Sequence, residues 1–247
     1  MDYKAEEWRR VWTKDVLKAY AKLLTSHPEL DLDKIPEFTN LVGRIQGYVG
    51  GVLGEMKVLE DNSLIDTAIT GLPNQTAFNK DIFKEVERSI RYGHPTALTI
   101  LDGNKFKRIN EKSYMAGNKA IATIGEIVSD SVRRTDTVYR WGGDEFCIIC
   151  PETEARKAYE IGERIAQKLN GVKIENYPIT VSQGIADYCP PAGEGNTSIL
   201  PKSLLINTVT AKRDELFNNA NTALHTAKDL YRRGQSEAPV VIYKADE

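Results

Sequence analysis

The stretch Arg140-Trp141-Gly142-Gly143-Asp144-Glu145-Phe146 places two glycines and two adjacent carboxylates between two segments of strand character. Residues 138–141 and 146–150 are mostly β-branched, aromatic or otherwise apolar, which is typical of paired strands. The sequence therefore predicts a β-hairpin with Asp144 and Glu145 at its turn. The glycines permit positive φ and close approach of a ligand to the backbone, and the two carboxylates repel each other unless a cation or solvent screens them. A divalent metal ion bound to a polyphosphate would supply such a charge, although an ordinary polar turn has the same composition.

A third carboxylate, Asp102, follows the apolar run of residues 97–101, which has the character of a strand. If the hairpin lies beside this strand, Asp102, Asp144 and Glu145 would form a three-carboxylate magnesium site. Lys105 and Lys107 follow closely enough to meet the phosphates that such an ion would hold. Taken alone, an aspartate in this place is equally typical of a turn at the end of a strand.

The composition limits the classes of function. The chain has 247 residues, 41% of them hydrophobic, and a formal net charge of -2, which argues against a dedicated nucleic-acid binder. We find no apolar run near the roughly 20 residues that span a bilayer, and no secretory signal pattern at the N-terminus, so we expect a cytoplasmic protein without a membrane segment. Three cysteines give no disulfide framework. Cys147 and Cys150 are expected to be core residues on opposite faces of a strand rather than a metal or redox pair.

Two regions of the chain differ in the spacing of their apolar residues. Residues 1–62 have apolar positions at helical spacing and predict a small helical module with a connecting helix, for dimerisation or sensing; the alternative is an extension that only packs on the main domain. Residues 63–247 alternate helices and strands, which predicts a layered α/β or α+β domain around one sheet. The expected helices span about 74–92, 117–132, 153–169 and 212–231, and the expected strands outside the hairpin span 97–101, 179–182 and 240–243.

From about Thr67 to about Ile242 the chain resembles a GGDEF-domain diguanylate cyclase. The pentapeptide from Gly142 to Phe146 is intact, and other family segments occur in the expected order and spacing. These segments are residues 70–74 (TGLPN), 102–110 (DGNKFKRIN), 180–186 (TVSQGIA) and 220–228 (ANTALHTAK). Together they are far more specific than the pentapeptide alone.

The resemblance implies an α+β fold, a ferredoxin-like polymerase palm, that condenses two GTP molecules into cyclic di-GMP and releases pyrophosphate. Each subunit of such enzymes holds one GTP, so a homodimer with two facing half-sites is implied. The implied cofactor is Mg²⁺, with Mn²⁺ as an alternative, and the two-metal logic is activation of the attacking oxygen and neutralisation of phosphate charge. The implied metal ligands are Asp102, the carbonyl of Gly103 and Asp144, with Glu145 completing the second metal site or helping to deprotonate the 3′-hydroxyl. The other implied substrate-binding residues are Phe106, Lys107, Asn110, Asn118, Gly142, Gly143, Lys228 and Arg232.

A product site is implied by Arg133 and Asp136, since Asp136 stands six positions before Gly142, as in the family's R-x-x-D inhibition site. In that site cyclic di-GMP binds as product and inhibitor. Arginine suits bidentate contact with guanine O6 and N7. Without this register, arginine and aspartate near a helix end are common.

The base-reading residues depart from the family. Asn110 stands at the first position, but the segment up to Asn118 is one residue short, lacks a Gly-His pair and ends in asparagine instead of aspartate. A carboxylate accepts both donors of guanine N1–H and N2–H₂, whereas an amide offers one acceptor and one donor and can pair with adenine. Losing one guanine contact would cost about 1–3 kcal/mol. Asn104, Thr67 and Tyr231 also depart, with consequences expected for local structure.

Three functions follow from these residues. The first is a cyclase that makes cyclic di-GMP, and the second is a dinucleotide cyclase with relaxed or altered base choice that makes a GMP-AMP or adenine-containing product. The third is a catalytically weak domain that binds GTP or cyclic di-GMP through Arg133 and Asp136 and signals by conformation.

Overall fold

The computed structural model describes residues 64–111, 113–191 and 202–244. The helical module predicted for residues 1–62 lies outside these ranges, and so does the boundary that we predict at 62 and 63. Within the described ranges, no helix is both long and apolar enough to cross a membrane.

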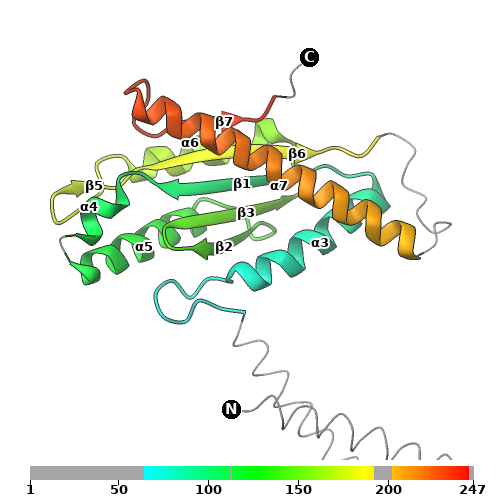
Figure 1. The fold of residues 1–247 in the computed structure, drawn as a ribbon, viewed down its shortest axis with the longest axis horizontal. Coiled ribbons are helices and arrows are strands. Elements are labelled where there is room, and N and C mark those ends of the chain that lie inside the picture. The colour runs from blue at the N-terminus through cyan, green and yellow to red at the C-terminus, as the bar shows by residue number, and fades with distance from the viewer. Residues whose placement is uncertain (1–63, 112, 192–201, 245–247) are drawn as a thin grey trace, which may run out of the picture. The chain divides into compact units, whose positions relative to one another are not determined.

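One five-stranded sheet, in the order β2-β3-β1-β6-β7, forms the centre of the domain (Figure 1). Central β1 is antiparallel to both of its neighbours, β3 and β6, and β7 is parallel to β6. The strand bounds are β1 Thr96–Gly103, β2 Thr137–Gly142, β3 Glu145–Pro151, β6 Val181–Tyr188 and β7 Val240–Ile242. A separate two-stranded sheet pairs β4 Lys173–Ile174 with β5 Tyr177–Pro178.

Helices cover both faces of the sheet, α3 and α7 on one face and α5 and α6 on the other (Figure 1). The helix bounds are α3 Gln75–Tyr92, α4 Phe106–Asn110, α5 Tyr114–Ser129, α6 Ala155–Leu169 and α7 Lys202–Arg232. This layering confirms the predicted helix-and-strand domain around one central sheet.

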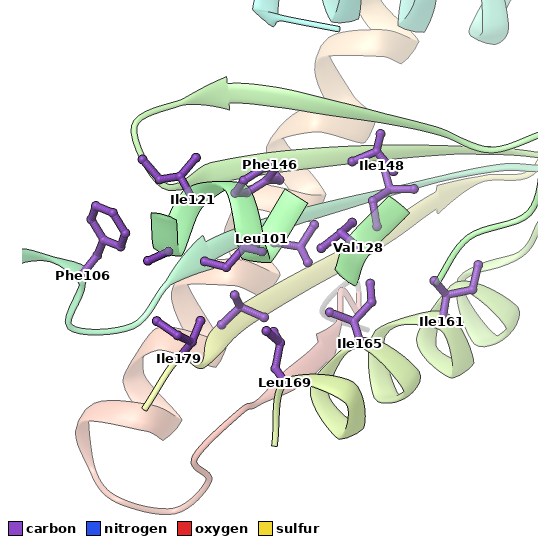
Figure 2. Packing of buried hydrophobic residues seen from close by; sticks show 14 of the residues in the cluster. Leu101, Phe106, Ile121, Val128, Phe146, Ile148, Ile161, Ile165, Leu169 and Ile179 are labelled. Carbon is purple, nitrogen blue, oxygen red and sulfur yellow. The ribbon is translucent and has the colours of Figure 1, made fainter. Parts of the chain in front are cut away.

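The strands bury both faces, so neighbouring side chains enter different cores. Leu101 and Phe146 pack with α5 and α6 (Figure 2), whereas Leu98 packs with α3 and α7. Cys147 and Cys150 are free, fully buried and divided between the two cores, as the strand period predicts.

A glycine brings α7 directly onto the sheet. A Cβ built on Gly184 of β6 would lie 2.1 Å from the backbone nitrogen of Leu224 and 2.3 Å from the carbonyl oxygen of Ala220, both in α7. Since backbone atoms cannot move aside as side-chain ends do, only glycine permits this approach. The close contact fixes the height of α7 above β6.

Several boundaries differ from those predicted. α5 ends at Ser129 rather than near 132, and the strand predicted at 179–182 is β6, which continues to Tyr188. The starts of two helices also differ. α7 begins at Lys202 rather than near 212, because Leu205 and Val209 extend its apolar face and pack in the core shared with α3. α5 begins at Tyr114 rather than near 117, because the Ser113 hydroxyl accepts hydrogen bonds from the backbone N–H groups of Met115 and Ala116. The short α4, which was not predicted, follows β1 directly.

Candidate active site

The predicted β-hairpin is present, with β2 and β3 joined through Gly143 and Asp144. Gly143 has φ +53°, in the left-handed region that glycine adopts at low cost. The register shifts between Arg140 and Gly142, and the Arg140 guanidinium donates hydrogen bonds to the Gly143 carbonyl oxygen at 3.1 and 3.0 Å. The turn is therefore closed by its own strand.

The same arginine ties the hairpin to the segment before α3. Arg140 Nη1 lies 2.8 Å from Asp66 Oδ2, and the backbone N–H of Arg140 donates to the carbonyl of Pro73 at 2.8 Å. Asp66 also accepts hydrogen bonds from the Thr70 hydroxyl and N–H at 2.7 and 3.1 Å. Burial raises the pKa of Asp66, but the hydrogen bonds from Arg140 and Thr70 outweigh it and hold the pKa below its ordinary value. Asp66, one position before Thr67, thus supplies a carboxylate that was not predicted from the sequence.

Aromatic packing holds the hairpin on its other side. Trp141, directly before Gly142, packs edge-on against Phe78 of α3 with ring centroids 5.0 Å apart, and its ring lies 5.0 Å from that of Phe217 in α7. The hairpin is therefore anchored by an ion pair and by a ring cluster.

The predicted carboxylates meet where the hairpin joins β1. Asp102 is paired with Glu145 across β1 and β3. The N–H of Gly103 donates to the carbonyl of Asp144 at 3.3 Å, and a Cβ on Gly103 would lie only 2.9 Å from Asp144 Oδ2. The absence of a side chain at Gly103 thus leaves room for the Asp144 carboxylate beside Asp102.

Lys228 of α7 reaches this cluster. Its ammonium lies 2.7 Å from Asp102 Oδ2, and both side chains are largely buried. Burial and the negative charges of Asp102 and Glu145 raise the pKa of Asp144 to about 6, while Lys228 acts in the opposite direction. Burial and Asp102 likewise raise the pKa of Glu145. The cluster has more negative charge than one lysine balances.

These donors fit magnesium. Carboxylate and carbonyl oxygens are its preferred ligands, and magnesium binds through one or two carboxylates together with waters and phosphate oxygens. In the described part of the chain, no three carboxylate, thiol or imidazole side chains converge closely enough to enclose an ion unaided. Asp102 and Asp144 are therefore suited to an ion whose remaining ligands are waters or other oxygen atoms.

Asn104, one of the departures from the family pattern, forms hydrogen bonds that stabilise the fold. Its amide nitrogen donates to the Thr180 hydroxyl at 3.1 Å, and its amide oxygen accepts from the Ser182 hydroxyl at 2.7 Å. The side chain is buried and satisfies a donor and an acceptor on β6 and the residue before it. An amide at this position therefore joins the end of β1 to β6.

The other predicted phosphate-binding residues lie around the cluster without joining it. Lys107 is 89% exposed and lies 3.9 Å from Glu111 on the same helical turn. Arg232, at the end of α7, pairs with Asp229 at 2.8 Å. Of the four cations predicted to meet phosphates, which are Lys105, Lys107, Lys228 and Arg232, Lys228 is the one whose ammonium contacts a predicted metal ligand.

The predicted base-reading residues lie where α4 meets α5. Asn110 ends α4, and its Oδ1 lies only 1.8 Å from the place that a Cβ on Gly117 would occupy. Asn118 is the next residue of α5 and is partly exposed. Phe106 is buried in the core below them (Figure 2). Gly117 therefore gives the Asn110 amide its space, and Asn118 is the neighbouring residue of α5.

Arg133 and Asp136 meet in a tight turn between α5 and β2. The backbone N–H of Arg133 donates to Asp136 Oδ2 at 2.9 Å, and that of Asp136 donates to the Arg133 carbonyl at 3.0 Å. Asp136 is 8% exposed, whereas the Arg133 side chain is exposed. The carboxylate thus stabilises the turn, and the guanidinium remains accessible to a ligand.

Comparison with known families finds one match, which includes most of the candidate site. The model of the family described as "Diguanylate cyclase, GGDEF domain" matches residues 63–214, more than half of the chain. The match includes the hairpin and all three carboxylates but ends before Lys228.

Two curated relatives illustrate how far this similarity extends. The chain is 30% identical over 165 residues to the cyclic di-GMP phosphodiesterase NbdA of Pseudomonas aeruginosa, which is 65% of this chain and 19% of that protein. It is 29% identical over 164 residues to the diguanylate cyclase DgcM of Escherichia coli (strain K12), which is 66% of this chain and 35% of that protein. The chain thus spans about a third or less of the length of these two relatives.

A solved structure has the same fold. The coiled coil and GGDEF domain of DgcB from Caulobacter crescentus, in complex with c-di-GMP, matches with a TM-score of 0.62 at 18% identity. The match covers 83% of this chain and 98% of that one. At this identity the likeness shows the fold, and it confirms the predicted α+β palm.

Proposed function

Because the chain belongs to the GGDEF-domain family of diguanylate cyclases, we propose that it condenses two GTP molecules into cyclic di-GMP and releases pyrophosphate. The observation that carries the proposal is the meeting of Asp102, Asp144 and Glu145 beside the Lys228 ammonium. An ordinary polar turn does not need a third carboxylate from another strand or a lysine from a distant helix. The arrangement is the one expected of a site for a metal-bound triphosphate.

The residues of the chain have separate roles in this reaction. Asp102, the Gly103 carbonyl and Asp144 would hold magnesium, which when bound neutralises charge on the phosphates and makes the 3′-hydroxyl more acidic. Lys228 is proposed to leave Asp102 and bind a phosphate oxygen when the ion neutralises that carboxylate. Lys107 and Arg232 are proposed as further phosphate contacts.

In each condensation, the 3′-oxygen of one GTP forms a bond to the α-phosphorus of the other, and the bond from that phosphorus to the β-bridging oxygen breaks. The electron pair leaves with pyrophosphate, and the hydroxyl proton passes toward Glu145. The raised pKa of Glu145 suits a proton acceptor. Two such steps close the ring, so we propose a homodimer in which each subunit presents one GTP to the other.

Altered base choice is the second candidate, and Asn118 is the observation that favours it. Asn118 directly follows Gly117, which gives the Asn110 amide its space, so both amides are proposed to face one base. Two amides can form hydrogen bonds with guanine or adenine, since each amide offers a donor and an acceptor. This site would make GMP-AMP or adenine-containing products alongside cyclic di-GMP.

Product binding is proposed at Arg133 and Asp136. The exposed guanidinium would contact guanine, while the Asp136 carboxylate would have to share its acceptor oxygens with the turn. A protein that binds at this site without turnover would be the third candidate, a binding module that signals by conformation.

One experiment separates these functions. The full chain is incubated at dimer-forming concentration with magnesium and GTP, ATP or both, and the products are identified by mass spectrometry. Cyclic di-GMP from GTP supports the main proposal, mixed products support altered base choice, and absence of every cyclic product rejects both. Asp144→Ala should abolish product and Asp214→Ala, an exposed carboxylate of α7, should not. Asn118→Asp should raise the preference for GTP; an unchanged product ratio would reject the role of Asn118.

A further inference from the structure

Lys105, in the loop that follows Asp102, has an unusual backbone conformation. Its φ is +54°, in the left-handed region where glycine or asparagine would cost less than lysine. A residue held in such a conformation beside a candidate active site is a candidate for a functional role.

The Lys105 ammonium lies over an aromatic ring of α7. Its Nζ is 5.2 Å from the centroid of the Tyr231 ring, close enough for a cation–π contact. Tyr231 is three residues after Lys228, which corresponds to a rise of about 4.5 Å along a helix. Lys228 contacts Asp102 at 2.7 Å, so the ring that Lys105 contacts belongs to a residue about one turn of α7 after the lysine that contacts the carboxylate cluster.

The strength of this contact suits a cation that changes partner. Tyr231 is partly exposed, and a cation over such a ring is held only weakly. An ammonium bound to a phosphate oxygen instead forms a charge-assisted hydrogen bond, about twice as strong as a neutral one. A triphosphate at the cluster would therefore draw Lys105 away from Tyr231.

We propose that Lys105 is a polyphosphate-binding residue of this site, and that Tyr231 holds its ammonium until a magnesium-bound nucleoside triphosphate arrives. The pair is a feature of this chain, since Tyr231 is one of its departures from the family pattern. The inference rests on the proposed function, because it needs a triphosphate beside Asp102.

The test measures the binding of magnesium tripolyphosphate to the full chain by isothermal titration calorimetry. This probe has the phosphates of the substrate but cannot be cyclised, so an inactive enzyme does not hide the result. Lys105→Met should weaken binding about tenfold, the equivalent of one charge-assisted hydrogen bond. Lys105→Arg should stay within about threefold of the unaltered chain, because it retains the charge. Lys157→Met removes an exposed lysine of α6 and is the control for net charge.

Tyr231→Leu tests whether the Tyr231 ring only holds the free Lys105 ammonium or is needed for the structure of the phosphate site. If the ring only holds the free cation, Tyr231→Leu binds the probe as well as the unaltered chain or up to about threefold more tightly, because no contact is given up. The proposal is overturned if Lys105→Met binds within twofold of the unaltered chain, or if Tyr231→Leu weakens binding as much as Lys105→Met. Absence of binding by the unaltered chain would overturn the phosphate site itself, and with it the proposed function.

Discussion

Replacing Asp66, which lies outside the β2–β3 hairpin but pairs with Arg140 in it, with asparagine should loosen the hairpin. Asp66 accepts hydrogen bonds from Arg140 and Thr70, and Arg140 in turn closes the turn through the Gly143 carbonyl. Asparagine keeps the shape of the side chain but removes its charge and one strong acceptor. The Arg140 guanidinium then stays partly buried without its anionic partner.

The expected cost follows from the burial of the pair. The side chains of Arg140 and Asp66 are 15% and 14% exposed. Exposed ion pairs contribute about 0–1 kcal/mol, and breaking a fully buried one costs about 3–5 kcal/mol, so we expect a loss of about 2 kcal/mol. For a domain of this size the loss corresponds to a fall in melting temperature of about 4–8 °C.

The loss should also depend on pH. The folded-state pKa of Asp66 lies below its ordinary value, so the pair stabilises the fold above that ordinary value and ceases to do so as the pH falls through the folded-state pKa. The difference in unfolding free energy between Asp66→Asn and the unaltered chain should therefore be constant near pH 7. Below about pH 4 it should shrink.

Urea denaturation followed by tryptophan fluorescence measures this difference. Replacing Trp8 and Trp12 with phenylalanine leaves Trp141, in strand β2 of the hairpin, as the single tryptophan of the chain. Thr67→Ala, an exposed neighbour of Asp66, is the matched control and should change stability by less than about 0.5 kcal/mol.

The pairing itself is tested by a double-mutant cycle with Arg140→Gln. A coupling energy above about 0.5 kcal/mol is expected for residues in direct contact. We also expect kcat of cyclic product formation to fall at least about tenfold for Asp66→Asn, since a small misplacement of Asp144 suffices. Stability within 0.5 kcal/mol of the unaltered chain, or additive effects in the cycle, would refute the role of the pair.

Three further outcomes are expected. Without metal, Asp144→Asn should be more stable than the unaltered chain by about 1 kcal/mol at pH 7.5, because a carboxyl with a pKa of about 6 destabilises the fold once it is ionised. This gain should vanish toward pH 4. Equal stability of the two proteins at both pH values would contradict the prediction. Gly117→Ala should raise KM for GTP about tenfold or more, because the new Cβ displaces the Asn110 amide, and should change the melting temperature little. An unchanged KM would contradict the placement of that amide. Arg133→Ala should relieve inhibition by cyclic di-GMP without loss of stability. Asp136→Ala should relieve inhibition and also lower the free energy of unfolding by about 1–2 kcal/mol, because it removes the hydrogen-bond acceptor of the turn. Retained inhibition in both variants would reject the product site.

The sequence predicted the parts of this fold that depend on local pattern. The hairpin with Asp144 and Glu145 at its turn and the opposite burial of Cys147 and Cys150 follow from turn chemistry and the period of a strand. The register that places Asp102 beside Glu145 was a conditional expectation, because a strand pattern does not identify its neighbour. Family resemblance supplied the missing pairing.

The features that the sequence did not reveal depend on contacts between distant segments. Asp66 lies 74 positions from Arg140, and nothing local distinguishes it from other loop aspartates. In the sequence, Asn104 is only a departure from a metal-binding pattern. Its hydrogen bonds with Thr180 and Ser182 depend on the position of a distant segment and could not be predicted. The approach of α7 to β6 at Gly184 likewise needs both backbones in place.

That approach determines how the site can respond to a ligand. With no room between Gly184 and the backbone of Leu224, α7 cannot slide or sink relative to the sheet while the two stay packed. In the proposed exchange of partners, Lys228 would then move by rotation about its own side-chain bonds. Loading of the proposed phosphate site on this side would therefore require a rotation of the Lys228 side chain and no movement of α7 relative to the sheet.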